Sequence, residues 1–277
     1  MAVDSAGKVL ARTVVGGLNW FNIGYDRARR NLREAVDRLL AETGAEGYSR
    51  IAVGTAGLDE PATEIQIREF CGGEFDPSEL TLVSDATAAL AGFAHRGPAA
   101  LVICGTGSAA ILRDAKGVEH PIAGWGHVIG DYGGSTMLAR EGLRAAMDAR
   151  DGCGPATRLD GLDLAFFGVS SARGLAEKVH GLPVDELAAF AREVLASAEA
   201  GDEVAAGIVR RQLTRLAKTV AAALSDFPEV RRLALHGGVF RHSAFAREEF
   251  TESINRLAPS VAVSMLNVPP EIGVLNI

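Results

Sequence analysis

The sequence predicts an α/β protein of two domains, and three observations support this prediction. Segments of strand and helix character alternate along the chain, as they do in α/β folds. The chain has 277 residues, which at about 150 residues per domain suggests two domains. Glycine contributes 32 residues, about 12% of the chain against about 7% in average usage. Because glycine gathers where backbone turns sharply or approaches a ligand, the glycine-dense segments are the first candidates for a site.

Composition argues against several classes of protein. Apolar residues make up 48% of the chain and charged residues 23%, which is typical of a folded globular protein. The net charge is −7, so we expect no nucleic-acid partner, since phosphate backbones are bound by cationic surfaces. Apolar runs end well before the roughly 18 residues that a membrane span needs, so we also expect no membrane partner.

Cysteine usage and the N-terminus predict a cytoplasmic protein. Cys71, Cys104 and Cys153 are scattered and form no CxxC pair, which argues against a disulfide scaffold and a zinc ribbon. The first residues lack the cationic and then apolar pattern of a signal peptide. The sequence leaves the oligomeric state open, a homodimer included.

The first predicted domain, residues 1–97, alternates strands and helices. We expect strands at residues 8–15, 51–54 and 80–83, and helices at residues 26–43, 63–70 and 86–93. A turn at residues 4–7 precedes the first strand, and a glycine-rich loop at residues 55–57 follows the second. Gly97 and Pro98 mark the predicted domain boundary.

The second predicted domain, residues 98–277, adds more strands and a long helical segment. We expect strands at residues 99–104, 109–113, 118–122, 233–236 and 261–265. Helices are expected at residues 135–149, through most of 156–226, and at 243–257.

The turn Gly105-Thr106-Gly107-Ser108 follows the first strand of this second domain. Backbone N–H groups of a glycine turn can converge on phosphate oxygens, and the hydroxyls of Thr106 and Ser108 would add donors. The letters also fit the dinucleotide fingerprint, but that fingerprint needs a following helix, and a hairpin is expected here instead. A plain β-turn remains the alternative.

Asp85 comes directly after a buried strand and opens a helix. Its carboxylate could simply cap the helix, which is the common use of aspartate at such a position. Ligands of open α/β sheets, however, gather beyond the carboxyl ends of strands, where an aspartate can accept a hydroxyl proton. Both interpretations stay open from the residues alone.

The segment 124–134 holds five glycines in eleven residues, which suggests a backbone that wraps closely around a ligand. Trp125 and Asp131 offer a flat ring and a carboxylate, which suit a polyhydroxylated ligand. The alternative is that Trp125 is a core residue and Asp131 caps the next helix. His127 is expected to be structural, and the histidines lack the spacing of a metal site. No G-x-S-x-G segment indicates a hydrolase.

Four segments together resemble the N-acetylglucosamine kinase and BadF/BadG/BcrA/BcrD-type ATPase family of the actin/Hsp70/sugar-kinase superfamily. They are Ser84-Asp85-Ala86, Cys104-Gly105-Thr106-Gly107-Ser108, residues 124–131, and Leu235-His236-Gly237-Gly238-Val239. Each motif is short, but their order and spacing match the family. The resemblance spans nearly the whole chain and implies two RNase H-like domains around a cleft.

The resemblance also implies ATP-dependent phosphorylation of an amino sugar, N-acetylglucosamine or glucosamine, at a primary hydroxyl, with Mg²⁺ accompanying ATP. Asp85 would be the general base that activates the sugar hydroxyl. Phosphate binding is implied for Gly105, Thr106, Gly107 and Ser108, and adenosine binding for Gly237 and Gly238. Sugar binding is implied for Asn19, Gly124, Trp125, Gly126 and Asp131.

The chain departs from the family pattern at both ends and at Tyr132, where relatives often carry an acidic residue. The family opens with a strand and an Asp-x-Gly-Gly-Thr phosphate loop, and we expect this first domain to lack them. Residues 269–274 resemble the start of the family's final helix.

Because of these departures, two other functions remain possible: a catalytically weak or inactive sugar-binding protein, and an ATPase that energises an electron-transfer partner. Such ATPases hold iron–sulfur clusters through cysteines, and the three here show no such arrangement.

Overall fold

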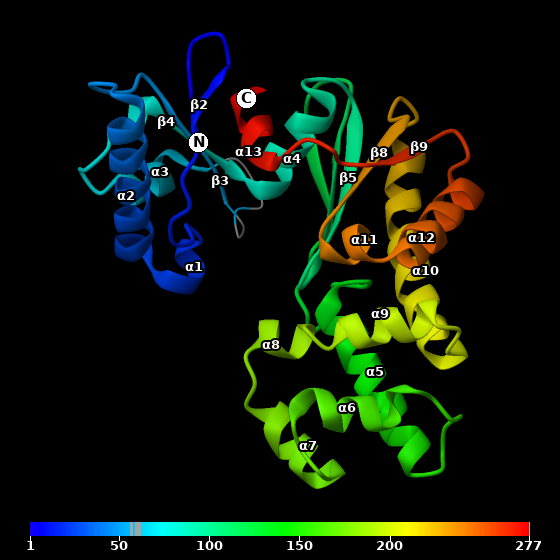
Figure 1. The fold of residues 1–277 in the computed structure, drawn as a ribbon. Coiled ribbons are helices and arrows are strands. Elements are labelled where there is room, and N and C mark those ends of the chain that lie inside the picture. The colour runs from blue at the N-terminus through cyan, green and yellow to red at the C-terminus, as the bar shows by residue number, and fades with distance from the viewer. Residues whose placement is uncertain (56–57, 59–61, 277) are drawn as a thin grey trace. The chain divides into compact units, whose positions relative to one another are not determined.

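The computed structural model describes residues 1–55, 58 and 62–276. The chain divides into two compact units, one of Met1–Arg96 with Asn267–Ile277 and the other of Gly97–Leu266. Both units combine strands and helices, which confirms the predicted α/β class (Figure 1). The predicted cleft between two domains stays a prediction.

The first unit contains two small sheets. The antiparallel pair is β1 (Ala2–Val3) and β2 (Val9–Ala11), and the parallel pair is β3 (Ile51–Thr55) and β4 (Leu80–Ser84). Its helical segments are α1 (Trp20–Ile23), α2 (Tyr25–Thr43), α3 (Glu64–Cys71), η1 (Pro77–Glu79), α4 (Asp85–Ala94), α13 (Pro270–Gly273) and η2 (Val274–Asn276). Thr55 lies opposite Ser84 in the register, so β3 and β4 end at the same edge. Asp85 follows directly at that edge.

Local sequence signals explain most of these elements. The predicted helix at residues 26–43 is confirmed as α2, which buries Leu32 and Val36 and ends at Gly44 with φ 68°. Strand β2 is shorter than the predicted strand at 8–15, and β1 was not predicted. In the turn between them, the Asp4 carboxylate accepts hydrogen bonds from the N–H groups of the residues at 6 and 8. Positions 56–57 of the predicted glycine-rich loop lie outside the described residues.

The C-terminal segment packs with the first unit, whereas the predicted second domain included it. The predicted helix start near residue 270 is confirmed as α13. A Cβ on Gly273 would lie 1.8 Å from the Ala88 carbonyl oxygen and 2.7 Å from the Gly92 backbone nitrogen. Val274 adds a buried apolar contact to Val83 and Ala88. This close approach of glycine backbone between α13 and α4 draws the segment into the first unit.

The second unit is built on a five-stranded mixed sheet in the order β7-β6-β5-β8-β9. Its strands are β5 (Ala99–Cys104), β6 (Ser108–Arg113), β7 (Glu119–Ala123), β8 (Arg232–His236) and β9 (Ala262–Met265). β5 is antiparallel to β6 and parallel to β8. The carboxyl ends of β5 and β8 therefore lie side by side.

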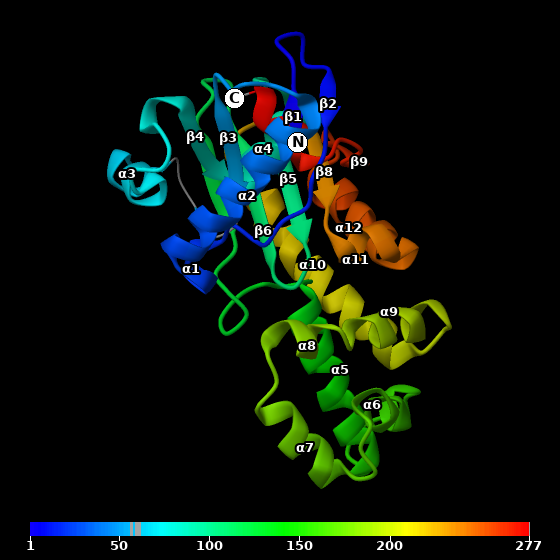
Figure 2. The same ribbon diagram turned by 60° about the vertical axis from the view of Figure 1, so that its left-hand side comes forward.

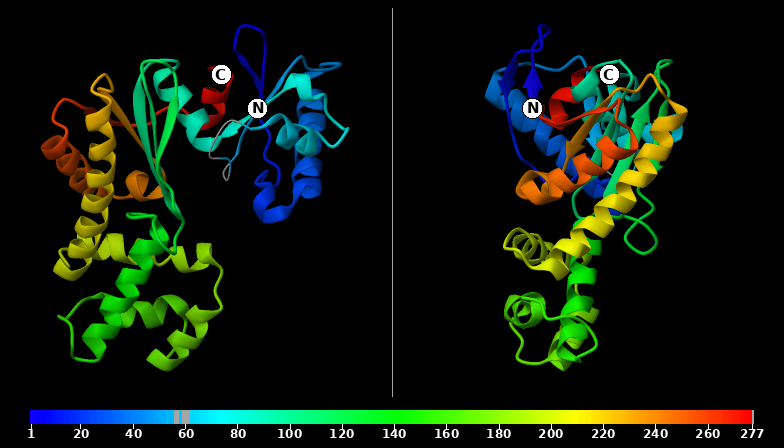
Figure 3. Two further views of the ribbon diagram at one scale, coloured as in Figure 1. Left: turned by 180° about the vertical axis from the view of Figure 1, so that it is seen from behind. Right: turned by 90° about the vertical axis from the view of Figure 1, so that its right-hand side faces the viewer.

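Helices connect and cover this sheet. They are α5 (Ser135–Arg150), α6 (Leu159–Phe167), α7 (Ala172–His180), α8 (Val184–Ala188), α9 (Ala191–Glu199), α10 (Glu203–Asp226), α11 (Gly238–His242) and α12 (Ala244–Leu257). Figure 2 shows α5 to α9 gathered at one end of the sheet, and Figure 3 shows α10 beside α12. One apolar core joins α5, α9, α10 and α12 to the buried face of the sheet.

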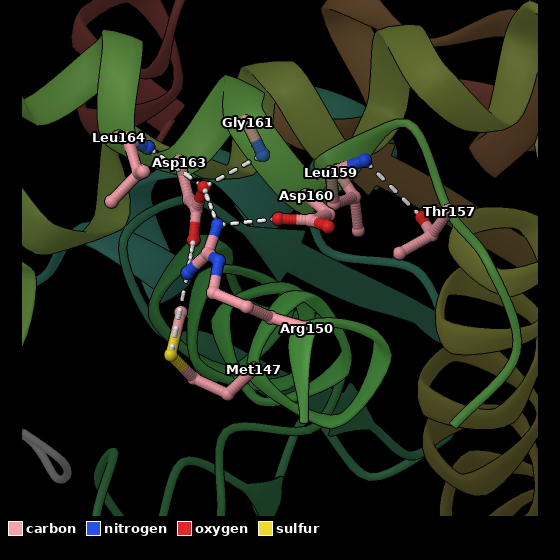
Figure 4. A network of polar contacts seen from close by, with 8 residues as sticks. All are labelled: Met147, Arg150, Thr157, Leu159, Asp160, Gly161, Asp163 and Leu164. Carbon is pink, nitrogen blue, oxygen red and sulfur yellow. Dashed lines mark hydrogen bonds and ion pairs between the residues drawn. The ribbon is translucent and has the colours of Figure 1, made fainter. Parts of the chain in front are cut away.

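A buried ion pair holds the helical segment together (Figure 4). Both carboxylate oxygens of the fully buried Asp163 accept hydrogen bonds from the Arg150 guanidinium, at 2.9 and 3.2 Å. Asp163 also accepts the backbone N–H groups of Gly161 and Leu164, and Arg150 reaches Asp160 as well. The pair therefore ties α5 to α6 with its buried charge fully hydrogen-bonded.

Within the described ranges, the structure contains no helix that combines the length and apolar character needed to cross a bilayer.

Candidate functional site

The turn at residues 105–108 joins β5 to β6 very tightly. Cys104 and Ser108 are opposite each other in the antiparallel register, so only three residues form the connection. The Gly105 N–H donates to the Gly107 carbonyl at 2.9 Å, which closes the turn. Thr106 lies at its tip and is exposed. Its side chain is therefore placed where a ligand could meet it.

Helix α5 begins against this turn. The N–H of Ser135 donates to the Gly105 carbonyl and the N–H of Thr136 to the Thr106 carbonyl, each at 2.9 Å. The first N–H groups of a helix have no partner inside the helix, so here they find one in the turn. Thr136 was not predicted as a site residue, although a Ser-Thr pair after two glycines is a helix-start signal.

Ser108 contacts the neighbouring glycine-rich segment through its backbone and not through its side chain. Its side chain is 5% exposed, and its Oγ has no hydrogen-bond partner among the described residues. Along β6, Ser108 alternates with Ala109 and shares the buried face with Ala110 and Leu112. Its backbone N–H donates to the Asp131 carboxylate. Because the Ser108 hydroxyl is buried, phosphate binding at this position would depend on the backbone of the turn.

The second glycine turn lies beside the first. In the parallel register Ile103 faces His236, so Gly237 follows β8 at the level where Cys104 ends β5. Gly237 has φ 102°, and a Cβ there would lie 2.2 Å from the Cys104 carbonyl oxygen. Only glycine fits this approach of backbone to backbone. Gly238 begins α11, and a Cβ there would make only an ordinary contact with the His242 ring at 3.9 Å.

The glycine-rich segment 124–134 leads from β7 to α5. Trp125 is 68% exposed, which contradicts the alternative that it is a core residue. The cap of α5 is Gly134, which contradicts the alternative that Asp131 caps this helix. Gly124 and Gly126 have φ values of 118° and 79°, a region that favours glycine. The exposed Trp125 ring is thus held on a backbone that turns sharply on both sides of it.

Asp131 lies where this segment meets the first turn. Its carboxylate accepts the Gly126 N–H at 3.1 Å, and its carbonyl accepts the Gly134 N–H at 3.0 Å. Burial raises the pKa of this carboxyl above its usual range, although the N–H groups of Ser108 and Gly126 and the nearby His127 oppose that rise. Asp131 itself has φ 57°, which few residues other than glycine adopt.

Two arginines hold the same segment and were not predicted. Arg140 of α5 donates to the His127 carbonyl at 2.7 Å. The Arg215 guanidinium of α10 lies 4.0 Å from the centre of the Tyr132 ring, a cation–π contact. Tyr132 is the position where an acidic residue was expected in relatives. No local sequence signal marks Arg215, because its partner comes from a distant part of the chain.

In the first unit, Asp85 is the first residue of α4 and is exposed. Ser84 caps this helix instead, because its Oγ accepts the Thr87 N–H at 2.9 Å. The capping interpretation of Asp85 is therefore wrong. The helix dipole favours the charged form of a carboxylate in the first helical turn.

Asn19 lies in the first unit just before α1 and is half-buried. Asn31 of α2 holds the chain just before Asn19. Its side chain donates to the Gly17 carbonyl at 2.7 Å and lies directly against Gly16. Trp20, which follows Asn19, is 5% exposed and stacks on Tyr25 with ring centres 5.6 Å apart.

The structure thus brings ten of the twelve predicted site residues together in the second unit and keeps Asn19 and Asp85 in the first. The ten are Gly105, Thr106, Gly107, Ser108, Gly124, Trp125, Gly126, Asp131, Gly237 and Gly238. Among the described residues, no group of three or more His, Cys, Asp and Glu side chains could hold a metal ion.

Comparison with known proteins identifies the family. An N-acetylmuramic acid/N-acetylglucosamine kinase of Clostridium acetobutylicum is 30% identical over 268 residues, which cover 94% of this chain and 88% of the relative. A candidate N-acetylglucosamine kinase of Chromobacterium violaceum has the same fold, with a TM-score of 0.78 at 21% identity over 98% of this chain and 92% of that one. A ROK family glucokinase of Streptomyces griseus, solved with glucose and AMPPNP, shares the fold with a TM-score of 0.58 at 15% identity, covering 99% and 92% of the two chains.

The model of one family matches residues 1–273, nearly the whole chain. The matched range includes the four motifs that resemble this family and the two glycine turns at the ends of β5 and β8. The chain belongs to the BadF/BadG/BcrA/BcrD ATPase family, as the motifs predicted.

Proposed function

We propose that this protein transfers the γ-phosphoryl group of ATP to the primary hydroxyl of an amino sugar, N-acetylglucosamine or glucosamine. One observation carries most of the proposal: the Gly105–Ser108 and Gly237-Gly238 turns lie side by side where β5 and β8 end. Two glycine turns at one sheet edge suit a nucleotide, because they let its phosphates approach the backbone closely. The named kinase activity of the Clostridium acetobutylicum relative supports the same assignment.

In this proposal the second unit binds ATP. Thr106 is exposed at the tip of the first turn and would meet the phosphates, while the Gly237-Gly238 turn would lie against the adenosine. Mg²⁺ is commonly held by substrate phosphates, waters and only one or two carboxylates. Because the described residues offer no acidic cluster, we expect Mg²⁺ to arrive with ATP and to neutralise charge on its phosphates.

The sugar would be held by Asn19 and by the segment that carries Gly124, Trp125, Gly126 and Asp131. The exposed Trp125 ring offers a flat apolar surface for a pyranose face, and carboxylate and amide groups suit sugar hydroxyls. Asp85 would accept the proton of the attacking hydroxyl. Phosphoryl transfer depends mainly on positioning and charge stabilisation, so one exposed carboxylate and the glycine turns are chemically sufficient.

The cysteines favour a kinase over an ATPase that carries an iron–sulfur cluster. Cys71 and Cys104 are buried, and only Cys153 of the three is exposed. Burial raises the pKa of both the Cys71 and the Cys104 thiol, whereas cluster ligands must be thiolates. The exposed Cys153 by itself cannot hold a cluster.

The test is an ADP-release assay with Mg-ATP and a panel of N-acetylglucosamine, glucosamine, N-acetylmuramic acid, N-acetylmannosamine and glucose. The proposal expects ADP release that depends on an amino sugar, together with a phosphorylated sugar of matching mass. ADP release that is independent of sugar would favour an ATPase. Sugar binding by calorimetry, without heat from Mg-ATP and without turnover, would favour a sugar-binding protein.

A further inference from the structure

The Asp131 side chain lies between the two segments to which we assign different ligands. Its carboxylate accepts the N–H of Ser108, in the nucleotide turn, and the N–H of Gly126, beside Trp125 in the sugar segment. Its own carbonyl accepts the Gly134 N–H at the start of α5. One residue thus joins the turn, the sugar segment and the helix behind them.

The fit around this carboxylate is close. A Cβ on Gly107 would lie 2.3 Å from Asp131 Oδ2, so the turn leaves room for the carboxylate and not for a side chain. A Cβ on Gly134 would lie 2.6 Å from the Gly107 carbonyl carbon. Glycine at both positions lets the turn rest directly on Asp131 and the residues after it.

The two N–H groups differ from ordinary backbone donors because their acceptor is charged. Hydrogen bonds to a charged acceptor are generally stronger than those between neutral groups. A carboxylate has about four acceptor sites on two oxygens, so Asp131 can hold both N–H groups and still accept a sugar hydroxyl. An asparagine has no charge and only one acceptor oxygen, so it would hold the two N–H groups less strongly.

We propose that Asp131 is a positioning residue that couples the nucleotide turn to the sugar segment, so that both ligands depend on one carboxylate. This proposal rests on the function proposed above. It goes beyond the sugar contact expected for Asp131, because it makes nucleotide affinity depend on a residue of the sugar segment. A ligand that orders the sugar segment would then also hold the Gly105–Ser108 turn in the position that binds the phosphates.

Calorimetric titration of the full chain tests this coupling. Mg-ADP and N-acetylglucosamine are titrated separately into the wild type, Asp131→Asn and Trp125→Ala. We expect Trp125→Ala to weaken N-acetylglucosamine binding at least tenfold and to leave the Kd for Mg-ADP within twofold of the wild type. Asp131→Asn is expected to weaken both ligands at least tenfold, with unchanged binding stoichiometry.

Stoichiometry separates positioning from mere stability. If Asp131 only stabilised the fold, the variant would bind fewer equivalents of Mg-ADP with the wild-type Kd, and that result overturns the proposal. A wild-type Kd and stoichiometry for Mg-ADP in Asp131→Asn, with weaker sugar binding, also overturns it and leaves the proposed function intact. A wild type that binds Mg-ADP but no sugar of the panel contradicts the proposed function itself and removes this proposal with it.

A second variant covers the case in which Asp131→Asn does not fold. Asp131→Gly removes the carboxylate, introduces no donor and suits the φ of 57° at this position. We expect it to weaken Mg-ADP binding at least tenfold, as Asp131→Asn does. The amide resonances of Ser108 and Gly126 should shift in both Asp131 variants, whereas in Trp125→Ala the Ser108 resonance should stay in place. An unmoved Ser108 resonance in both Asp131 variants would contradict the coupling.

Discussion

The Thr106 carbonyl accepts two hydrogen bonds from Thr136, one from its backbone N–H and one from its Oγ1, each at 2.9 Å. Thr136 is fully buried in the first turn of α5, and Thr106 is the exposed tip of the turn between β5 and β6. The helix therefore sets the position of the residue proposed to meet the phosphates. This relationship leads to the first prediction.

Thr136→Val should weaken nucleotide binding, because it keeps the shape of the side chain and removes the hydroxyl donor. A single hydrogen bond contributes about 1 kcal/mol, so the Kd for Mg-ADP should rise about fivefold. Thr136→Ser keeps the hydroxyl and is the matched control, with a Kd near that of the wild type. Equal affinities in the two variants would show that the hydroxyl does not position Thr106.

Asp85→Asn should lower turnover and leave nucleotide binding nearly unchanged. If Asp85 is the general base, kcat should fall roughly 100-fold or more, about 2.7 kcal/mol in the barrier. Asp26→Asn is the matched control, since Asp26 is also an exposed aspartate in the first turn of a helix of the same unit. Unchanged turnover in Asp85→Asn would reject Asp85 as the base.

Gly237→Ala should damage both stability and nucleotide affinity. The new Cβ would lie 2.2 Å from the Cys104 carbonyl oxygen at a φ of 102°, and such strain costs on the order of 1–3 kcal/mol. The two turns would have to separate to relieve it. Gly181→Ala is the control, because Gly181 of the same unit has φ −105° and a Cβ there would meet nothing within 4 Å. Urea unfolding and Mg-ADP titration measure the two effects, and equal behaviour of the two variants would contradict the geometry.

The ion pair in Figure 4 predicts a large loss of stability for Arg150→Met. The substitution leaves the fully buried Asp163 carboxylate without its cation, which typically costs about 3–5 kcal/mol. Arg144→Met on the same helix removes an exposed pair with Glu141, and it should cost about 0.5 kcal/mol or less. Chemical unfolding of the two variants at neutral pH compares them directly. Similar losses in both would mean that Asp163 is not held by Arg150.

The β6–β7 hairpin should contribute stability that depends on pH. The hydrogen bond from His120, and then those from the N–H groups of Val118 and Lys116, lower the pKa of Asp114 despite its partial desolvation. A carboxyl with a lowered pKa stabilises the fold above its ordinary pKa, and this contribution disappears as the pH falls through the lowered value. The free energy of unfolding of the wild type should therefore exceed that of Asp114→Asn at neutral pH, and the difference should shrink in acid. A difference that is constant between about pH 7 and about pH 3 would contradict this.

Much of the local structure follows from the sequence. Helix α2 was predictable because Leu32 and Val36 recur on one face and Gly44 ends it. The two glycine turns were predictable because glycine gathers where backbone segments approach closely, as Gly237 approaches the Cys104 carbonyl. Asp85 was placed correctly at the start of a helix, but Ser84 caps that helix, and adjacent capping residues are hard to separate from sequence alone.

The contacts between distant segments were not predictable in the same way. Nothing local to residues 267–276 indicates that Gly273 would pack on Ala88, so their place in the first unit was missed. Thr136 and Arg215 were missed for the same reason, since each acts on a partner far away in the chain. Such contacts depend on which elements pack together.

The sequence by itself determined the α/β class and the positions of the glycine turns. These features arise from periodicity, capping and backbone freedom, which act between near neighbours. Only the tertiary structure decided that β5 and β8 end side by side and that the Asp131 carboxylate would join the Ser108 and Gly126 N–H groups. The reason is physical: a backbone N–H bonds to an acceptor within its reach, and the packing of the core decides which distant segment supplies that acceptor.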